Sequence, residues 1–275
     1  LICELNYLLD ELGMDTMSTA GSIAFAMELN EKNMWDNGLE FGQTDNLPAI
    51  MKDIAYRQGI GDLLAEGSKR LAEKFGGQEF AINVKGMELA AYEPRGAVGQ
   101  GLGYAVANRG GCHLNAGYMV FMEGLGLGMN TKTPHSKASL SILMQNLMEA
   151  VSAAGNCLFT TYALIPGVLL HDNRSILSHS ANAILRWSGP IVSLLNKKPG
   201  LVNFHFPLLP HTKVLKAVTG LPITFGSFLK IGARGYNLER MFNLRMGLTA
   251  QDDTLPKRLT DEYQVFPTNN KTVVP

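Results

Sequence analysis

Apolar residues recur at helical spacing along most of this 275-residue chain. Stretches in which they return at about every third or fourth position predict amphipathic helices. Strand patterns are confined to Phe80–Val84 and Leu201–Phe206. The predicted fold class is therefore mainly α and multihelical. The expected helices are Ile2–Leu12, Ser22–Asn30, Asp45–Tyr56, Ile60–Phe75, Lys137–Ala154, Arg174–Leu195, His211–Val218 and Thr224–Met246.

Two turns that contain glycine, Lys85–Gly86 and Pro199–Gly200, separate groups of these helices. We expect the chain to cross at these turns between two interleaved all-α subdomains. One subdomain would carry the candidate chemistry, and the other would lie outside it. Their predicted extents are residues 1–17 plus 88–200 for the first, and residues 18–87 plus 201–275 for the second.

The segment between Lys85 and Cys112 breaks the helical pattern because it is dense in glycine. Such density is typical of turns with positive φ or of backbone that passes close to another group. The segment also contains Arg95 and Arg109, and guanidinium groups beside exposed backbone amides suit a phosphate or another oxyanion. A long structural loop with surface arginines is the alternative interpretation.

Two short segments, roughly 140 residues apart, resemble each other in a way typical of an internal repeat. We call Asp10–Asp15 the first arm and Ser152–Cys157 the second arm. Each follows an apolar stretch of helical period, with a glycine where a helix would end and a candidate ligand two residues later. The second arm ends in cysteine, and Asn108–Leu114, with its own cysteine and histidine, lies between the arms. We therefore expect the arms to hold one pseudo-symmetric, metal-containing ligand; two ordinary helix ends are the alternative.

Composition narrows the class of protein. Hydrophobic residues make up 46% and charged residues 17%, which excludes extensive disorder. Lys plus Arg and Asp plus Glu number 24 each, so no net charge favours nucleic acid or an anionic membrane. No apolar run approaches the roughly 20 residues of a membrane span. Three cysteines at these spacings suit neither a disulfide framework nor a zinc knuckle, which predicts a reducing, cytoplasmic compartment. The chain begins within a predicted helix, so we expect that it was cut from a longer one.

Several motifs, in order and spacing, resemble the C-terminal part of the tungsten-dependent aldehyde ferredoxin oxidoreductases. The resemblance covers essentially the whole chain, and Tyr236–Gly247 is its most specific motif. The segments that carry it are Asp10–Thr19, Ala91–Gly96, Asn108–Leu114, Gly155–Cys157, Tyr236–Gly247 and Asp252–Arg258.

The resemblance implies a set of cofactors and the residues that hold them. In that family two molybdopterins bind a tungsten, or sometimes molybdenum, atom beside a [4Fe-4S] cluster, and magnesium is a further ion that the resemblance allows. Cys157 would be the fourth thiolate of the cluster; a buried structural thiol is the alternative. The implied pterin contacts are Asp10, Met14 (through its backbone), Asp15, Ser152, Asn156 and Leu158, together with Arg109 and Asn115 for pterin or its phosphate.

Some of these positions depart from the family pattern or have a plainer interpretation. The family usually has aspartate at Ser152, leucine at Asn156 and lysine at Asn115, so two charged contacts become neutral ones. Asp15 could be only a helix cap. His113 matches the histidine near the open side of the metal, where imidazole could move a proton or bond a substrate oxygen. A histidine that is merely packed is the alternative.

The resemblance also implies an activity. Aldehydes would be oxidised to carboxylates, or the reverse, with electrons passing through the cluster to ferredoxin or a similar carrier in an anaerobic, cytoplasmic enzyme, with a homodimer as one possible assembly. No three-cysteine cluster motif occurs in this sequence, which agrees with a truncated chain. Two alternatives stay open: a subunit of the type found in tungsten-dependent aromatic acyl-CoA reductases, and a non-catalytic helical module of a larger assembly.

Overall fold

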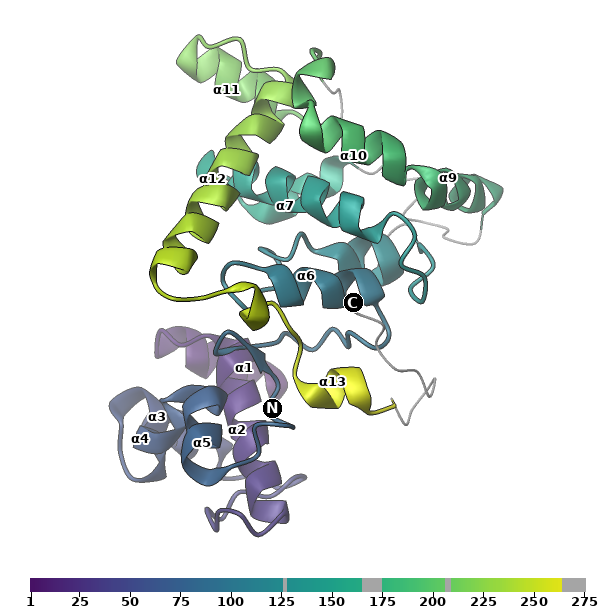
Figure 1. Cartoon of the computed structure of the whole chain (residues 1–275). Helices are drawn as coiled ribbons and strands as arrows, with labels where there is room; N and C mark the ends of the chain where they lie inside the picture. Colours follow the sequence, from purple (N-terminus) through teal and green to yellow (C-terminus); the bar gives the residue numbers. More distant parts are fainter. Residues whose placement is uncertain (126–127, 165–174, 206–208, 264–275) are drawn as a thin grey trace.

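The computed structural model describes residues 1–125, 128–164, 175–205 and 209–263, whose regular structure is almost entirely helical (Figure 1). This confirms the mainly α, multihelical fold class. Within these described ranges, no helix combines the length and the apolar character needed to cross a bilayer. The described helices form two groups, and the last of them returns to the first group (Figure 1).

The helices of the N-terminal group pack around one apolar cluster, in which Leu29, Leu64 and Leu71 are almost fully buried. The cluster also takes in Leu9, so the helix that leads into the first arm is anchored at its last turn. These helices are α1 (Ile2–Glu11), α2 (Thr16–Glu31), α3 (Leu47–Tyr56), α4 (Ile60–Leu64) and α5 (Gly67–Phe75).

The predicted helix Ile60–Phe75 is two helices in the structure. α4 ends at Leu64, and Gly67, with φ of +81°, turns the chain into α5. The backbone N–H of Ser68, in the first turn of α5, donates to the carboxylate of Glu88 at 2.7 Å. Periodicity does not show this break because the residue that caps the second helix lies 20 positions further along the chain.

A short hairpin follows α5. β1 (Asn83–Val84) pairs antiparallel with β2 (Met87–Glu88). The turn between them has positive φ at both Lys85 and Gly86, as a type I′ turn requires. The predicted strand Phe80–Val84 is therefore limited to its last two residues, whereas the expected turn is present.

The glycine-rich segment, expected as turns or loop, contains the helix α6 (Val98–Val106), so that expectation is wrong for these residues. The cause is Glu123, whose carboxylate accepts the backbone N–H groups of Gly99 and Gln100 at 2.8 and 2.9 Å. A carboxylate at a helix N-terminus satisfies orphan donors and complements the helix dipole. Gly103 lies where a Cβ would overlap the backbone of Ala116, so this glycine permits close packing.

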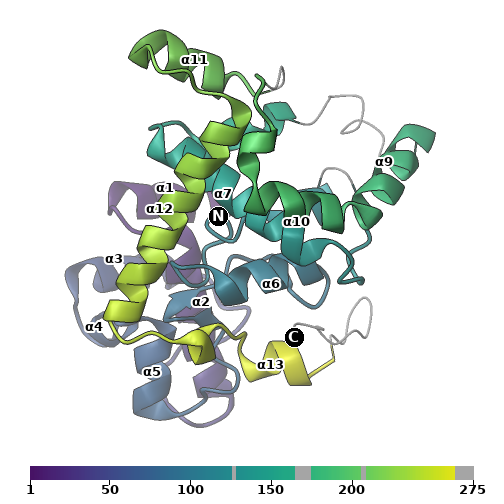
Figure 2. The ribbon, with the colours of Figure 1, turned by 45° about the horizontal axis from the view of Figure 1, so that its top comes forward.

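The C-terminal group is built on two helices that cross closely, as Figure 2 shows for α7 and α12. They meet at Gly232, where any Cβ would overlap the carbonyl of Asn146. Val151 and Phe228 are fully buried in their shared cluster. The elements are the π-helix η1 (Phe121–Leu125), α7 (Lys137–Ala153), the 3₁₀ helix η2 (Leu158–Leu164), α9 (Ile176–Trp187), α10 (Gly189–Lys197), the 3₁₀ helix η3 (Pro199–Leu201), α11 (His211–Thr219) and α12 (Phe225–Arg245).

The predicted helix Arg174–Leu195 is divided into α9 and α10 at Ser188. The next residue, Gly189, packs against Ser136, whose hydroxyl accepts its N–H at 2.9 Å. This distant contact takes the place of a helical hydrogen bond and redirects the chain. Arg174 itself lies outside the described residues.

The predicted strand Leu201–Phe206 is wrong over the part that the structure describes. η3 ends at Leu201, and residues 202–205 form no ladder with any described strand. Phe206 lies outside the described residues. Backbone groups here serve α12 instead: the carbonyl oxygens of Val202 and Phe204 accept the N–H groups of Gly226 and Phe225.

The apolar clusters group the helices differently from the predicted subdomains. Leu9 of α1 packs with α2–α5, and Phe228 of α12 packs with α7. The chain then returns through η4 (Ala250–Asp252) to α13 (Lys257–Asp261). The division at residues 17, 87 and 200 stays a prediction.

A buried ion pair links η1 to the start of α7. Lys137 Nζ lies 2.6 Å from Glu123 Oε1, and the two side chains are 1% and 0% exposed. Because the same carboxylate caps α6, this pair fixes the glycine-rich segment against the C-terminal group.

We expect Lys137→Met to lower the free energy of unfolding by about 3 kcal/mol, because it leaves a buried carboxylate without its counter-charge. Lys132→Met, at an exposed position, should change it by less than about 0.5 kcal/mol. Urea denaturation followed by circular dichroism measures both values. Equal stabilities of the two variants would contradict the assigned role of the pair.

Candidate functional site

The first arm forms a tight C-terminal turn on α1. Gly13 has φ of +69° and donates its N–H to the carbonyl of Asp10 at 3.1 Å, while Met14 donates to Leu9 at 2.9 Å. These two bonds define a Schellman turn, which satisfies the last helical carbonyls and needs a left-handed residue. The glycine in the sequence repeat is therefore required by the backbone.

The second arm has the same turn at the end of α7. Gly155 has φ of +71°, and its N–H donates to the carbonyl of Ser152 at 2.9 Å. The N–H of Asn156 reaches back to Val151 at 3.2 Å. The two arms thus repeat each other in backbone conformation as well as in sequence.

The turn alone does not identify a ligand site. The same pair of hydrogen bonds ends α3 at Arg57 and α12 at Gly247. Only the side chains and the surroundings distinguish the two arms from these ordinary helix ends. Whether the arms are more than two ordinary helix ends therefore depends on the side chains that face each of them.

The carboxylates of the first arm are exposed. Asp15 Oδ2 caps α2 by accepting the N–H of Ser18 at 2.7 Å, so the helix-cap interpretation is correct for one of its oxygens. Asp10 Oδ2 accepts only a weak bond from the amide of Asn6 at 3.2 Å. Each carboxylate keeps an oxygen that no described residue engages.

Cys157 is an exposed free cysteine, so a buried structural thiol is the wrong interpretation of it. Its carbonyl accepts both the N–H and the hydroxyl of Thr160, at 3.0 and 2.6 Å. The same hydroxyl lies 2.6 Å from Nε2 of His211, which is 5% exposed. These bonds fix the backbone at Cys157 and leave the thiol accessible.

The loop Asn108–Leu114 lies directly on the hairpin. At Gly110 a Cβ would overlap the carbonyl of Val84, and at Gly111 it would overlap the backbone of β2. Glycine is required at both positions for this close approach. The contact places the next residues, Cys112 and His113, beside the N-terminal group.

His113 lies half-buried in an aromatic cluster. Its ring centroid is 5.6 Å from that of Tyr92 and 5.5 Å from that of Tyr118. Burial lowers the pKa of His113 below its ordinary value, and the nearby carboxylate of Asp15 acts in the opposite direction. The imidazole is therefore neutral at pH 7 and able to accept a proton.

The same cluster reaches the second arm. The ring of Phe159, two residues after Cys157, packs edge-on against Tyr118 at 6.4 Å between centroids. His113 is therefore linked to the segment after the second arm through Tyr118 and Phe159, and the Asp15 carboxylate of the first arm acts on its pKa. That these residues form one site with both arms stays a prediction.

Arg109 and Asn115 are turned toward α12. The amide of Asn115 donates to Glu239 Oε2 at 3.1 Å, and Nε of Arg109 lies 3.8 Å from Glu239 Oε1. Asn243, one helical turn further on, donates to the carbonyl of Asn108 at 2.7 Å. The motif Tyr236–Gly247 thus holds the loop Asn108–Leu114, which we call the histidine loop. Sequence reasoning missed Glu239 as a contributor, although its i, i+4 spacing from Asn243 indicates a shared helix face.

One pocket is lined by the first arm, and another lies at the loop Asn108–Leu114 and α12. A pocket of about 520 Å³ is lined by the first arm together with α2, α3 and the start of α5. A second, of about 490 Å³, contains Arg109, Glu239 and Glu149, the last of which is one turn before Ser152 on α7. Burial raises the pKa of Glu149, and the Glu239 carboxylate adds to this. Among the described residues, no three His, Cys, Asp or Glu side chains are arranged to hold an ion.

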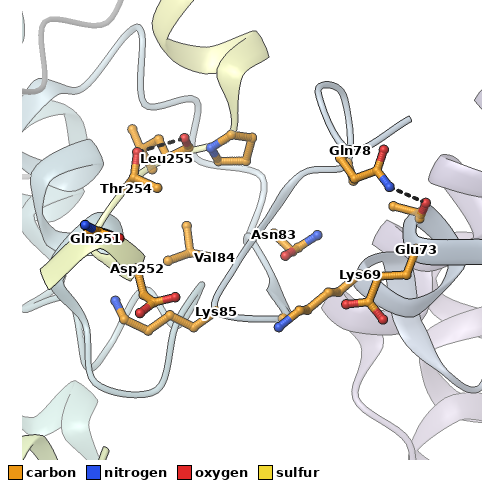
Figure 3. A pocket seen from close by; sticks show the side chains of 14 residues that line it. Lys69, Glu73, Gln78, Asn83, Val84, Lys85, Gln251, Asp252, Thr254 and Leu255 are labelled. Atoms are coloured by element: carbon orange, nitrogen blue, oxygen red, sulfur yellow. Dashed lines mark hydrogen bonds between the residues drawn. The ribbon is translucent and has the colours of Figure 1, made fainter. Parts of the chain in front are cut away.

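The pocket in Figure 3, of about 310 Å³, lies elsewhere, between α5, the hairpin and the segment after α12. Lys85 lies beside Asp252 in this view, but its side chain is 2% exposed and its ammonium group is already paired with Asp253 at 2.8 Å. None of the predicted site residues lines this pocket. It lies where the segment after α12 packs against the N-terminal group.

Comparison with known proteins gives a consistent answer. The family model described as "Aldehyde ferredoxin oxidoreductase, domains 2 & 3" matches residues 1–274. The chain belongs to the aldehyde ferredoxin oxidoreductase family. It is 41% identical over 273 residues to a tungsten-containing aldehyde ferredoxin oxidoreductase of Pyrococcus furiosus, and equally to one of Thermococcus kodakarensis. Both alignments cover 95% of this chain and 38% of the relative.

The chain is also similar, at lower identity, to the "Aliphatic sulfonate oxidoreductase, WOR-like subunit" of Pyrococcus furiosus. It is 33% identical over 125 residues, which is 41% of this chain and 20% of the relative. This chain thus spans well under half the length of the curated relatives it matches. Their activities describe those whole proteins.

The residues present fit the cofactors implied for the aldehyde ferredoxin oxidoreductase family. The first-arm pocket is lined with oxygen acceptors and, among its described lining residues, contains no Lys, Arg or His. Such a surface suits the N–H groups of a pterin edge. The exposed thiol of Cys157 suits iron, although a four-iron cluster needs about three further thiolates.

We expect Asp15→Asn to lower the pKa of His113 further, because the substitution removes the carboxylate that opposes the effect of burial. Asparagine is also a good N-cap, so α2 should keep its first turn. NMR titration of the His113 ring protons measures the change. A pKa that stays the same or rises would show that the two side chains do not interact.

Proposed function

We propose that this chain is part of an oxidoreductase that converts aldehydes to carboxylates, or the reverse, at a tungsten bis-pterin centre. The observation that carries the proposal is the position of His113. Its imidazole packs on Tyr118, which contacts the segment after the second arm, and the Asp15 carboxylate of the first arm acts to raise its pKa. A neutral base between two matching arms is what such a centre needs from this chain.

Each arm would hold one pterin, and Cys157 would be one ligand of a [4Fe-4S] cluster. When bound, these groups supply the two-electron oxidation of the aldehyde and the onward transfer of single electrons. Magnesium is not proposed, because no set of ligands for an ion gathers among the described residues. The proposed pterin contacts are Asp10, the backbone of Met14 and Asp15 in the first arm, and Ser152, Asn156 and Leu158 at the second.

The proposed roles of Arg109 and Asn115 differ from each other. The Arg109 side chain is 43% exposed and only 3.8 Å from Glu239, so it is free to turn toward a pterin phosphate. Asn115 is 6% exposed, and its amide is bonded to Glu239 and to the N–H of Arg109. We therefore assign to Asn115 the support of the histidine loop.

The aldehyde and water together would become a carboxylate with release of protons and of two electrons to the bound cofactors, and His113 would accept one of the protons. The hydrogen bond with Tyr118, with burial adding to it, raises the pKa of Tyr92 to about 12, so this phenol stays protonated. The two tyrosines orient the imidazole and restrict the approach of water to it. Of these aromatic side chains, the imidazole of His113 would thereby be the one that accepts a proton.

Family membership supports the remaining parts of the proposal. The electron acceptor would be ferredoxin or a similar carrier, and the substrate a small aldehyde or acid. A homodimer and a cytoplasmic location stay predictions from the sequence. Tungsten is proposed over molybdenum because the relatives named above are described as tungsten-containing.

Anaerobic assay of the purified holoenzyme with a series of aldehydes and a low-potential dye tests this function. We expect aldehyde-dependent dye reduction with carboxylate as product. Activity only with an aromatic acyl-CoA would favour the reductase-type alternative. Absence of tungsten, molybdenum and iron from the preparation would favour a non-catalytic helical module.

A further inference from the structure

Glu88, on β2, is a buried carboxylate that the site described above does not use. The residue is 6% exposed, and it lines the first-arm pocket together with Asp15. Two glycines make room for it: a Cβ at Gly21 would lie 3.0 Å from its side chain, and one at Gly67 would lie 3.1 Å from Oε1. The fold therefore accommodates a charged group at the wall of this pocket.

The two oxygens of this carboxylate have different surroundings. Oε1 accepts the N–H and the hydroxyl of Ser68, at 2.7 and 2.8 Å, and the hydroxyl of Ser22 at 3.3 Å. Oε2 accepts no hydrogen bond from any described residue, and it is not among the unpartnered side-chain atoms that are sealed from solvent. One oxygen thus fixes the side chain, and the other is left open to the pocket.

The rest of the pocket selects the kind of ligand. Its polar lining consists of carboxylates and hydroxyls, which include Asp15 and Ser18, and no Lys, Arg or His is among its described lining residues. A third carboxylate, Glu66, is already paired with Arg57 at 2.8 Å. A wall of this composition accepts hydrogen bonds from a neutral ligand that presents several N–H groups along one edge.

The geometry points to Glu88 as an acceptor for the amino-pyrimidine edge of the pterin that the first arm holds. The inference rests on the proposed function and adds to it a residue outside both arms. An amino group beside a ring N–H presents two donors, and Oε2 would accept one of them. Because the side chain is already fixed by the three hydrogen bonds to Oε1, this contact would cost little side-chain freedom. Glu88 would thus set the orientation of the ring, while the first arm holds its rim.

The test uses the purified holoenzyme and the Glu88→Gln variant. Glutamine keeps an oxygen that can accept the bonds from Ser68 and Ser22, but it places an NH₂ donor where Oε2 faces the pocket. We expect the variant to release pterin about 10- to 100-fold faster on incubation than the parent enzyme, the usual effect of losing a charge-assisted hydrogen bond. Released pterin is measured by its fluorescence after oxidation, with tungsten followed by mass spectrometry.

Two control variants separate binding from stability. Ser68→Ala removes one donor to Oε1, the hydroxyl, without touching Oε2, and Glu66→Gln changes an Arg-paired carboxylate of the same pocket. We expect both to release pterin at the parental rate. If Glu88→Gln also releases it at that rate, or if Ser68→Ala releases it as fast as Glu88→Gln does, the role assigned to Glu88 is overturned. A parent holoenzyme without pterin would overturn the proposed function as well, which distinguishes the two failures.

Discussion

We expect the Cys157→Ala holoenzyme to lose the proposed [4Fe-4S] cluster and, with it, the proposed aldehyde-dependent electron transfer. Cys157 is an exposed thiol on a backbone that Thr160 and His211 hold in place, so the substitution removes a ligand while leaving that loop intact. Iron should fall from about four atoms per chain to near zero, because a cluster of this type depends on its four thiolates. Chemical iron analysis and electron paramagnetic resonance of the reduced protein measure the loss.

Cys3→Ala is the matched control for this prediction. Cys3 is also an exposed free cysteine, but it lies on α1, seven residues before the first arm begins. We expect this variant to keep its iron and its signal. Retention of a full cluster in Cys157→Ala would show that the second arm does not bind iron.

The second large effect is expected for His113→Gln, which should lower kcat by about 10²- to 10⁴-fold, the range typical of losing a general base. Pterin, tungsten and iron contents should stay at parental levels, because His113 is not assigned to hold any of them. His135→Gln is the control, since His135 is exposed and its ring contacts Trp187, which belongs to neither arm. Steady-state kinetics with a saturating aldehyde measure kcat for both variants.

The pH dependence of the activity tests whether His113 acts as a base. A base must be deprotonated to act, and burial lowers the pKa of His113. The parent enzyme should therefore keep full activity at pH 7 and lose it on the acid side, below the ordinary histidine pKa of about 6.5. His113→Gln should lack this acid limb. An unchanged limb in the variant would assign the titration to another group.

Local signals explain what the sequence could predict. The Schellman turns at Gly13 and Gly155 follow from apolar periodicity that ends at a glycine, and both are readable within a few residues. The exposure of Cys157 and the position of His113 follow less directly, because they depend on an aromatic cluster drawn from separate segments. The assignment of these residues to one site stays a prediction.

The features that sequence reasoning missed are those made by residues far apart in the chain. Glu123 caps α6 from 24 residues away, which turns a glycine-rich segment into a helix. Glu239 bonds Asn115 across 124 residues, and Glu88 bonds Ser22 across 66. In each case a carboxylate satisfies donors that carry no local sign of their partner. Tertiary contacts of this kind override propensity and are not visible as periodicity.

The central claim is that both arms hold one metal centre beside His113. Anomalous diffraction at the tungsten absorption edge, from crystals of the holoenzyme, tests it most directly. The account predicts one tungsten peak between the first arm and the second, on the side of the His113 imidazole. A peak distant from either arm, or no tungsten peak in an active enzyme, would contradict it.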